Sequence, residues 1–335
     1  MRSLEERIIT KNDDNIDELR RRYPGGLHFA VGDVHDEVST LMKLMEKIKF
    51  NPDKDHVYFV GDYNGGGNTF ELLRYMADYF QADFNAPGFH MIRGNHEREL
   101  YPVYMLENLP DIIVIRGKKL VFYIVHAGMV SSAFELISDD IAKEPDKTVY
   151  AYRLEDNTCE FNAPLRQIVW SMRGLYSQNS HWRVWPREEE LISRNACIIH
   201  GHSPYCFFKE ADRFTYGSDN LFWQKQHMWF CSELRSFNID SNVKGRYQNG
   251  ESYRGLSCIC MEVYDELAAK NDGKLTADLV YEAENGIFGV ELDYSMPVKE
   301  GGSPDRILGA SVEMKTIGVE KRQPVFRDET DAKMV

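Results

Sequence analysis

Short apolar runs that end in polar residues recur through the first 200 residues, and they constrain the fold of this chain most strongly. Five of them are LHFAVGD (27–33), HVYFVGD (56–62), FHMIRGN (89–95), LVFYIVHAG (120–128) and ACIIHGH (196–202). Apolar runs bounded by turn signals are typical of buried β-strands. EVSTLMKLMEKIKF (37–50) and TFELLRYMADYF (69–80) have helical character, and in the first the apolar residues follow helical spacing. Alternation of strands and helices predicts βαβ units, and therefore an α/β fold.

The later part of the chain is less regular. Residues 131–195 interrupt the pattern, and we expect an insertion there that covers one side of the core. LSCICMEVYDE (256–266) predicts a final strand. The segment 296–335 is polar with little periodicity, so we expect one domain over residues 1–295 and a flexible C-terminal extension over 296–335.

Each of the five runs ends on residues that bind metals in proteins. They are Asp33 and His35, Asp62, Asn95, His126 and His202. A lone Asp after a strand is usually a turn or cap residue, and a lone His is usually structural. Six such residues on five strand ends favour a metal site instead, because ligand sites in open α/β sheets lie beyond the carboxyl ends of the strands.

These side chains supply oxygen and imidazole nitrogen donors, which suit Mn²⁺ first, with Fe or Zn²⁺ as alternatives. Asp62 is the carboxylate placed centrally enough in the order to bridge two ions. Two ions acidify a shared water and hold a phosphoryl oxygen, so that hydroxide attacks phosphorus in line. The predicted reaction is phosphoester hydrolysis.

The motifs GDVH, GDY, RGNHE, VHAG and GH, in this order, resemble the metal-dependent phosphoprotein phosphatase family within the calcineurin-like metallophosphoesterases. The resemblance covers about residues 27–265, and NIDSNVKGR (238–246) is similar to the closing element of that family. It implies a four-layer α/β/β/α sandwich with insertions, and phosphorylated Ser or Thr in proteins, or small phosphoesters, as substrates.

The resemblance also implies roles for individual residues. Asp33, His35 and Asp62 would hold the first metal. Asp62, Asn95, His126 and His202 would hold the second, with Asn95 also binding the substrate phosphate and Asp62 counted as a catalytic residue. His96 would be the general acid that protonates the leaving alkoxide.

One stretch, GDYNGGGN (61–68), departs from the family pattern GDxxDRG. Gly65 stands where the family has an Asp that orients His96, and Gly66 stands where it has an Arg that binds phosphate. Metal binding should therefore persist, while phosphate binding and leaving-group protonation are altered. The glycines are either a flexible turn or a cradle of backbone N–H groups for a phosphate.

Other residues could replace the missing pair. Arg173, in IVWSMRG (168–174), resembles the element from which relatives project a second phosphate-binding Arg, although it could equally pack beside a neighbouring Trp. Glu97 or Asp36 could supply the missing carboxylate, and Asn64 or Asn68 could partner His96. His200 is expected behind the metal ligands.

The amino-acid composition excludes some classes of function and partner. The net charge of -13 argues against a general nucleic-acid or anionic-membrane surface. No apolar run has membrane-spanning length, the first residues lack a signal-peptide core, and the six cysteines form no CxxC pair, so we expect a cytoplasmic protein. Two rival hypotheses stay open: a diadenosine tetraphosphatase-like hydrolase whose Trp-rich stretch HWRVWPRE (181–188) stacks a base, and a metal-binding scaffold without catalysis.

Overall fold

The described residues of the computed structural model are 12–64, 72, 76, 88–98, 109–154, 159–160, 163–164, 185–202, 221–223, 228–232, 235–240, 255–283, 286–291 and 314–317. They form two mixed β-sheets flanked by helices, together with a short ribbon of β7 (Cys159–Glu160) and β8 (Ala163–Pro164). Among these residues, no helix combines the length and the apolar character needed to cross a bilayer.

The five-stranded sheet has the order β14-β13-β1-β2-β3. Its strands are β1 (His28–Val31), β2 (His56–Phe59), β3 (Phe89–Met91), β13 (Gly255–Cys260) and β14 (Ile287–Glu291). β1, β2 and β3 run parallel to one another, and β13 and β14 are antiparallel additions at one side. The three parallel strands therefore end at the same edge, as the predicted βαβ units require.

The eight-stranded sheet has the order β10-β11-β12-β9-β5-β4-β6-β15. Its strands are β4 (Ile112–Arg116), β5 (Val121–Val125), β6 (Val149–Leu154), β9 (Ala196–His200), β10 (Leu221–Trp223), β11 (Trp229–Cys231), β12 (Ser236–Asn238) and β15 (Met314–Ile317). β5, β9 and β12 are parallel neighbours, so their carboxyl ends also share one edge.

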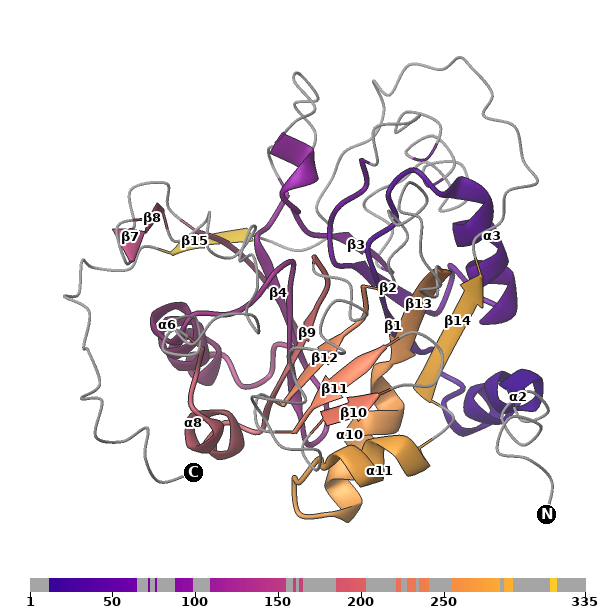
Figure 1. Ribbon diagram of the computed structural model, residues 1–335. Coiled ribbons are helices and arrows are strands. Elements are labelled where there is room, and N and C mark those ends of the chain that lie inside the picture. Colours follow the sequence, from indigo (N-terminus) through magenta and orange to yellow (C-terminus); the bar gives the residue numbers. More distant parts are fainter. Residues whose placement is uncertain are drawn as a thin grey trace.

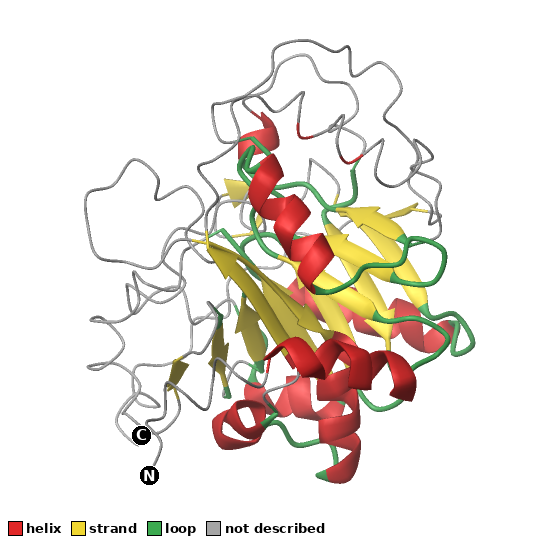
Figure 2. Cartoon of the chain, turned by 90° about the vertical axis from the view of Figure 1, so that its right-hand side faces the viewer, coloured by secondary structure: helices red, strands yellow, loops and turns green. Residues whose placement is uncertain are grey.

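The helices lie on the outer faces of the two sheets (Figure 1). α2 (Asn12–Arg22) and α3 (Val38–Lys47) lie beside the five-stranded sheet, and α6 (Ser131–Lys143) and α8 (Glu188–Ser193) lie beside the eight-stranded sheet. α10 (Met261–Lys270) and α11 (Ala277–Glu282) lie next to each other at one end of the sandwich. η1 (His96–Arg98) is a single 3₁₀ turn after β3. Figure 2 shows the strands and the flanking helices from a second direction, and one buried apolar cluster joins the facing sides of the two sheets. The predicted four-layer α/β/β/α arrangement is confirmed.

The packing of the core explains why the sequences of the parallel strands are apolar throughout. On β1, Phe29 and Val31 point into the cluster under α2 and α3, whereas Ala30 points into the cluster between the sheets. On α3, Leu41, Leu44 and Met45 are fully buried, while Met42 is 39% exposed on the outer side. Burying a Leu or Met side chain stabilises the fold by about 1.5–3 kcal/mol relative to leaving it exposed. Because buried clusters cover both faces of the five-stranded sheet, both faces contribute to the stability of the fold.

Three segments differ from expectation. The predicted strand 256–266 ends at Cys260, and the chain continues as helix α10, because Met261, Tyr264, Asp265 and Ala268 form a buried stripe at helical spacing. Part of the expected insertion lies in the central layers, since β6 pairs with β4 inside the eight-stranded sheet.

Part of the expected C-terminal extension is ordered as well. β15 pairs in parallel with β6 at the edge of the sheet, and Lys315 binds Asp140 of α6 at 3.0 Å. The boundary between a domain over 1–295 and an extension over 296–335 remains a proposal.

Candidate metal centre

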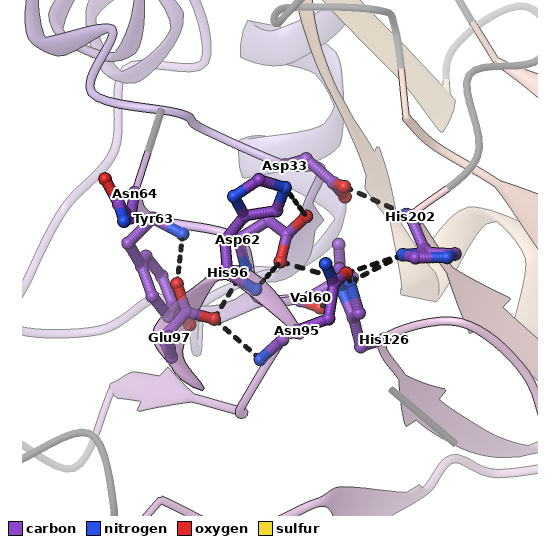
Figure 3. Close-up of polar contacts among 12 residues, drawn as sticks. Asp33, Val60, Asp62, Tyr63, Asn64, Asn95, His96, Glu97, His126 and His202 are labelled. Atoms are coloured by element: carbon purple, nitrogen blue, oxygen red, sulfur yellow. Dashed lines mark hydrogen bonds and ion pairs between the residues drawn. The ribbon is translucent and has the colours of Figure 1, made fainter. Parts of the chain in front are cut away.

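The strand ends that carry the candidate metal ligands lie together in the structure (Figure 3). His35 N donates to Asp62 O at 2.9 Å, which joins the chain beyond β1 to the chain beyond β2. His202 N donates to Asp33 Oδ2 at 2.9 Å. This second bond joins the end of β9 to the end of β1, so the site lies where the two sheets meet.

Asp62 is the centre of a first group of potential ligands with His35 and His96. One ligand atom from each of the three residues lies within 4.8 Å of the others. Asp62 Oδ2 is 3.7 Å from His35 Nε2 and 3.9 Å from His96 Nε2. His96 was expected to act on the substrate, and the structure places its ring beside this group, with its edge against the ring of His35 at 5.1 Å between centroids.

Asp62 also belongs to a second group, with His126 and His202. Asp62 Oδ1 is 3.2 Å from His126 Nε2. Asn95 completes this side of the site, because its Oδ1 lies 2.9 Å from His126 Nε2 and 2.7 Å from His202 Nδ1. One carboxylate therefore faces two sets of potential ligands, one with each oxygen.

Asp33 lies beside these groups and has an unused oxygen. Its Oδ1 is buried and has no hydrogen-bond partner among the described residues, although its Oδ2 accepts from His202 N. Burial raises the pKa of Asp33 well above its usual value, and the charges of Asp240 and Asp62 raise it further. Crowded buried carboxylates are costly unless a cation is present, so these residues fit a site for divalent ions.

The histidines are held in the form that binds metals. His126 Nδ1 lies 2.8 Å from Val60 O, and His35 Nδ1 lies 3.0 Å from Asn64 O. Because a carbonyl oxygen only accepts hydrogen bonds, both Nδ1 atoms carry the proton and both Nε2 atoms present a lone pair. Burial, followed by the neighbouring His202, lowers the pKa of His126 well below its usual value. This ring is therefore neutral and ready to coordinate a cation.

The backbone is strained at three of these residues. His35, Asp62 and His202 have φ values of 44°, 53° and 69°. Residues other than Gly rarely adopt this left-handed region, which costs about 1–3 kcal/mol for each residue. Such strain recurs at functional sites, and these three residues also belong to the candidate metal groups.

Two residues near the ligands have structural roles. Glu97 is buried, and its carboxylate accepts backbone hydrogen bonds from Asp62, Tyr63, Asn64 and Gly94. Its role as a substitute partner of His96 stays a prediction. His200 is also buried, with its ring 5.9 Å from that of Trp185 and its Nδ1 3.2 Å from Gly201 O. Burial lowers the pKa of His200 to about 4, which keeps it neutral in the core.

Asp240 is a charged residue of the site that sequence reasoning did not single out. It follows β12, is 2% exposed, and acts on Asp33 through its charge. The signal in the sequence was NID (238–240), the start of the stretch that resembles the closing element of the family. Its carboxylate cannot be recognised as part of the site without knowing that β12 pairs with β9.

Several predicted positions lie outside the described residues. They are Gly65, Gly66, Asn68 and Arg173. The proposed phosphate-binding role of Arg173 therefore stays a prediction.

Comparison with known proteins identifies the class. A family model described as calcineurin-like phosphoesterase matches residues 29–206, which is more than half of the 335 residues. The chain belongs to this family. It is accordingly a metal-dependent phosphoesterase, a hydrolase whose candidate metal ligands lie in the matched region.

Curated relatives share a shorter segment. The symmetrical bis(5'-nucleosyl)-tetraphosphatase of Thioalkalivibrio sulfidiphilus is 31% identical over 77 residues, which cover 23% of this chain and 26% of that protein. The enzyme of the same name from Serratia proteamaculans is 30% identical over 77 residues, covering 23% and 25%. The matched segment thus spans about a quarter of the length of these relatives.

Two solved structures align with most of this chain. A putative diadenosine tetraphosphatase is 17% identical and covers 81% of this chain and 96% of its own, with a TM-score of 0.42. A protein serine/threonine phosphatase from Saccharomyces cerevisiae is 14% identical and covers 76% and 81%, with a TM-score of 0.34.

Proposed function

We propose that this protein is a two-metal phosphoesterase that hydrolyses phosphomonoesters, with phosphorylated Ser or Thr residues of proteins as its substrate class. The observation that carries the proposal is the position of Asp62, whose two carboxylate oxygens face two different groups of potential ligands. A carboxylate placed in this way suits a bridge between two ions.

The residues divide into two ligand sets in this proposal. Asp33, His35 and Asp62 hold one ion. Asp62, Asn95, His126 and His202 hold the other, with the proton on His126 Nδ1 kept in place by Val60 O. When bound, two such ions acidify water and stabilise negative charge on a phosphoryl group. Mn²⁺ suits this mixture of oxygen and nitrogen donors, with Fe or Zn²⁺ as alternatives.

His96 is the proposed proton donor to the leaving alkoxide. Its backbone N–H donates to Asp62 Oδ1 at 3.0 Å, which ties this turn to the site, and its side chain is 15% exposed. A general acid contributes about 10²–10⁴-fold to the rate. Replacing His96 should lower turnover by a factor in this range and leave the ions bound.

A second candidate function is hydrolysis of nucleotide polyphosphates. The curated matches favour it, because both reported relatives are named as bis(5'-nucleosyl)-tetraphosphatases. The departure at Gly65 and Gly66 supports it too, since a substrate anchored through its base and additional phosphates depends less on the Arg that binds a monoester.

The cytoplasmic location also remains a proposal. Cys197, Cys258 and Cys260 are buried free thiols, as is usual for proteins in reducing compartments.

The deciding experiment compares substrates on protein reconstituted with Mn²⁺. The substrates are p-nitrophenyl phosphate, bis-p-nitrophenyl phosphate, a phosphoserine peptide and diadenosine tetraphosphate. His96→Ala tests the general acid, and His28→Ala, at the amino end of β1 and far from the site, serves as the matched control.

Turnover of the monoester and the peptide that collapses in His96→Ala but not in His28→Ala supports the proposal. Faster turnover of diadenosine tetraphosphate would favour the second candidate. Two bound ions with no turnover of any substrate would refute both and point to a scaffold.

A further inference from the structure

Glu97 is a buried carboxylate that touches two ligand-bearing loops at once. It is 4% exposed. Its Oε2 accepts from Asp62 N at 3.0 Å and from Gly94 N at 2.7 Å, and its Oε1 accepts from Tyr63 N at 2.7 Å. The first and third donors belong to the loop after β2, and the second belongs to the loop after β3. A carboxylate bound in this way is a strong, oriented anchor for backbone N–H groups.

The contacts around Asp62 are reciprocal. While Glu97 holds Asp62 N, the side chain of Asp62 accepts from His96 N at 3.0 Å through Oδ1. Asp62 itself has a φ of 53°, a conformation that the surrounding contacts must maintain. Gly94 passes so close to Asp62 that a Cβ on Gly94 would clash with Asp62 N and Asp62 Oδ1, and it would also lie 2.7 Å from Glu97 Oε2. The loop after β2 and the loop after β3 are therefore in close contact, and Gly94 leaves no room for a side chain between them.

We propose that Glu97 is a positioning residue of the metal centre: by holding Asp62 N, Tyr63 N and Gly94 N, it keeps the Asp62 carboxylate between the two ligand groups. This inference rests on the proposed two-metal function. Glu97 does not touch the ions or the substrate, and its effect is transmitted through the backbone of Asp62. Outer residues that orient metal ligands typically contribute about 10- to 100-fold to metal affinity.

The same chain contains a matched control for such an anchor. Asp265 of α10 is 7% exposed and accepts from Lys118 N at 2.8 Å, Lys119 N at 2.8 Å and Leu120 N at 2.6 Å. It too accepts from several loop N–H groups, and here the three donors are consecutive in one loop. However, it does so before the first residue of β5, at the strand end opposite His126. Loss of either anchor should destabilise the fold, whereas only loss of Glu97 should disturb the ions.

The experiment compares Glu97→Gln with Asp265→Asn in the full chain. Both amides keep the shape of the side chain but accept on one side only, so both variants should unfold at a lower urea concentration than the wild type. Mn²⁺ binding is then measured by calorimetry and by metal content after dialysis, and the spectrum of the Mn²⁺ pair is recorded by electron paramagnetic resonance.

We expect Glu97→Gln to bind at least one Mn²⁺ about 10- to 100-fold more weakly and to lose the spectrum of a coupled pair. Its kcat should fall more than its KM rises. Asp265→Asn should match the wild type in affinity and spectrum. If Glu97→Gln does not fold, Glu97→Asp, which keeps the charge but is too short to reach all three donors, replaces it with the same expected losses.

Wild-type affinity and an unchanged coupled spectrum in the Glu97 variant would overturn the inference, because Glu97 would then be a stability anchor like Asp265. A wild-type chain that binds fewer than two ions would overturn it as well. A wild-type chain that binds two coupled ions but hydrolyses no phosphoester would refute the proposed function alone, since the binding measurements on Glu97 still decide this inference.

Discussion

Gly61→Ala would test how closely the two ligand-bearing loops pack. Gly61 precedes Asp62 and has a φ of 103°, where side chains other than Gly are strained. A Cβ there would lie 2.7 Å from Gly94 N, 2.8 Å from Gly94 Cα and 2.9 Å from His126 Nδ1. Two of these atoms are backbone and the third is a ring that donates to Val60 O, so none can move without disturbing the site.

The expected cost has two parts. Strain in a sparsely populated backbone region contributes about 1–3 kcal/mol, and overpacking of a filled interior contributes about 1–3 kcal/mol. The sum of about 2–6 kcal/mol is a large share of the 5–15 kcal/mol that stabilises a typical domain. Because the clash lies against Gly94 and His126, metal affinity should fall along with stability.

Urea unfolding and Mn²⁺ titration measure the two effects. Gly25→Ala is the control, since no heavy atom of the described residues lies within 4 Å of a Cβ at that position. The control should be neutral or slightly stabilising, because Ala reduces the freedom of the unfolded chain. A Gly61→Ala protein with the stability and metal affinity of the control would refute the close packing deduced for this turn.

Two further predictions concern charge. Asp62→Asn keeps an oxygen that accepts from His96 N but removes the negative charge shared by the two ions. Both ions and turnover should therefore be lost, while the metal-free protein stays folded. Unchanged metal content would contradict the bridging role of Asp62. For His200, burial lowers the pKa to about 4, so the unfolded chain binds the proton more tightly. The free energy of unfolding therefore includes a contribution from neutral His200 that is fully present above about pH 6.5. Protonation of His200 in the unfolded chain lowers the free energy of unfolding by about 2 kcal/mol at pH 5 and about 3 kcal/mol at pH 4. Urea unfolding of metal-free His200→Gln should lack this loss, and equal pH slopes in both proteins would disprove the assignment.

The positions of the candidate metal ligands were predictable because they depend on local signals. Each of the parallel strands is a continuous apolar run, and each ends where polar residues begin. Parallel neighbours bring their carboxyl ends to a common edge, so Asp33, Asp62 and Asn95 had to lie near one another once β1, β2 and β3 were recognised. His126 and His202 follow from the same rule on β5 and β9.

Some boundaries were not predictable in this way. The stretch 256–266 is apolar enough for a strand throughout, but after Cys260 the chain turns into α10, because Tyr264 and Ala268 pack into the core between the sheets. β6 and β15 likewise depend on partners far away in the chain, since each is defined by pairing with another strand.

The sequence by itself therefore determined the fold class and which residues could bind metals, because strand length, apolar runs and residue chemistry are local properties. Only the tertiary structure decided that Asp62 faces two groups of candidate ligands, that the charge of Asp240 raises the pKa of Asp33, and that Glu97 accepts from backbone N–H groups of two loops. These roles depend on distances between loops that are far apart in the chain, and such distances exist only once the two sheets have packed together.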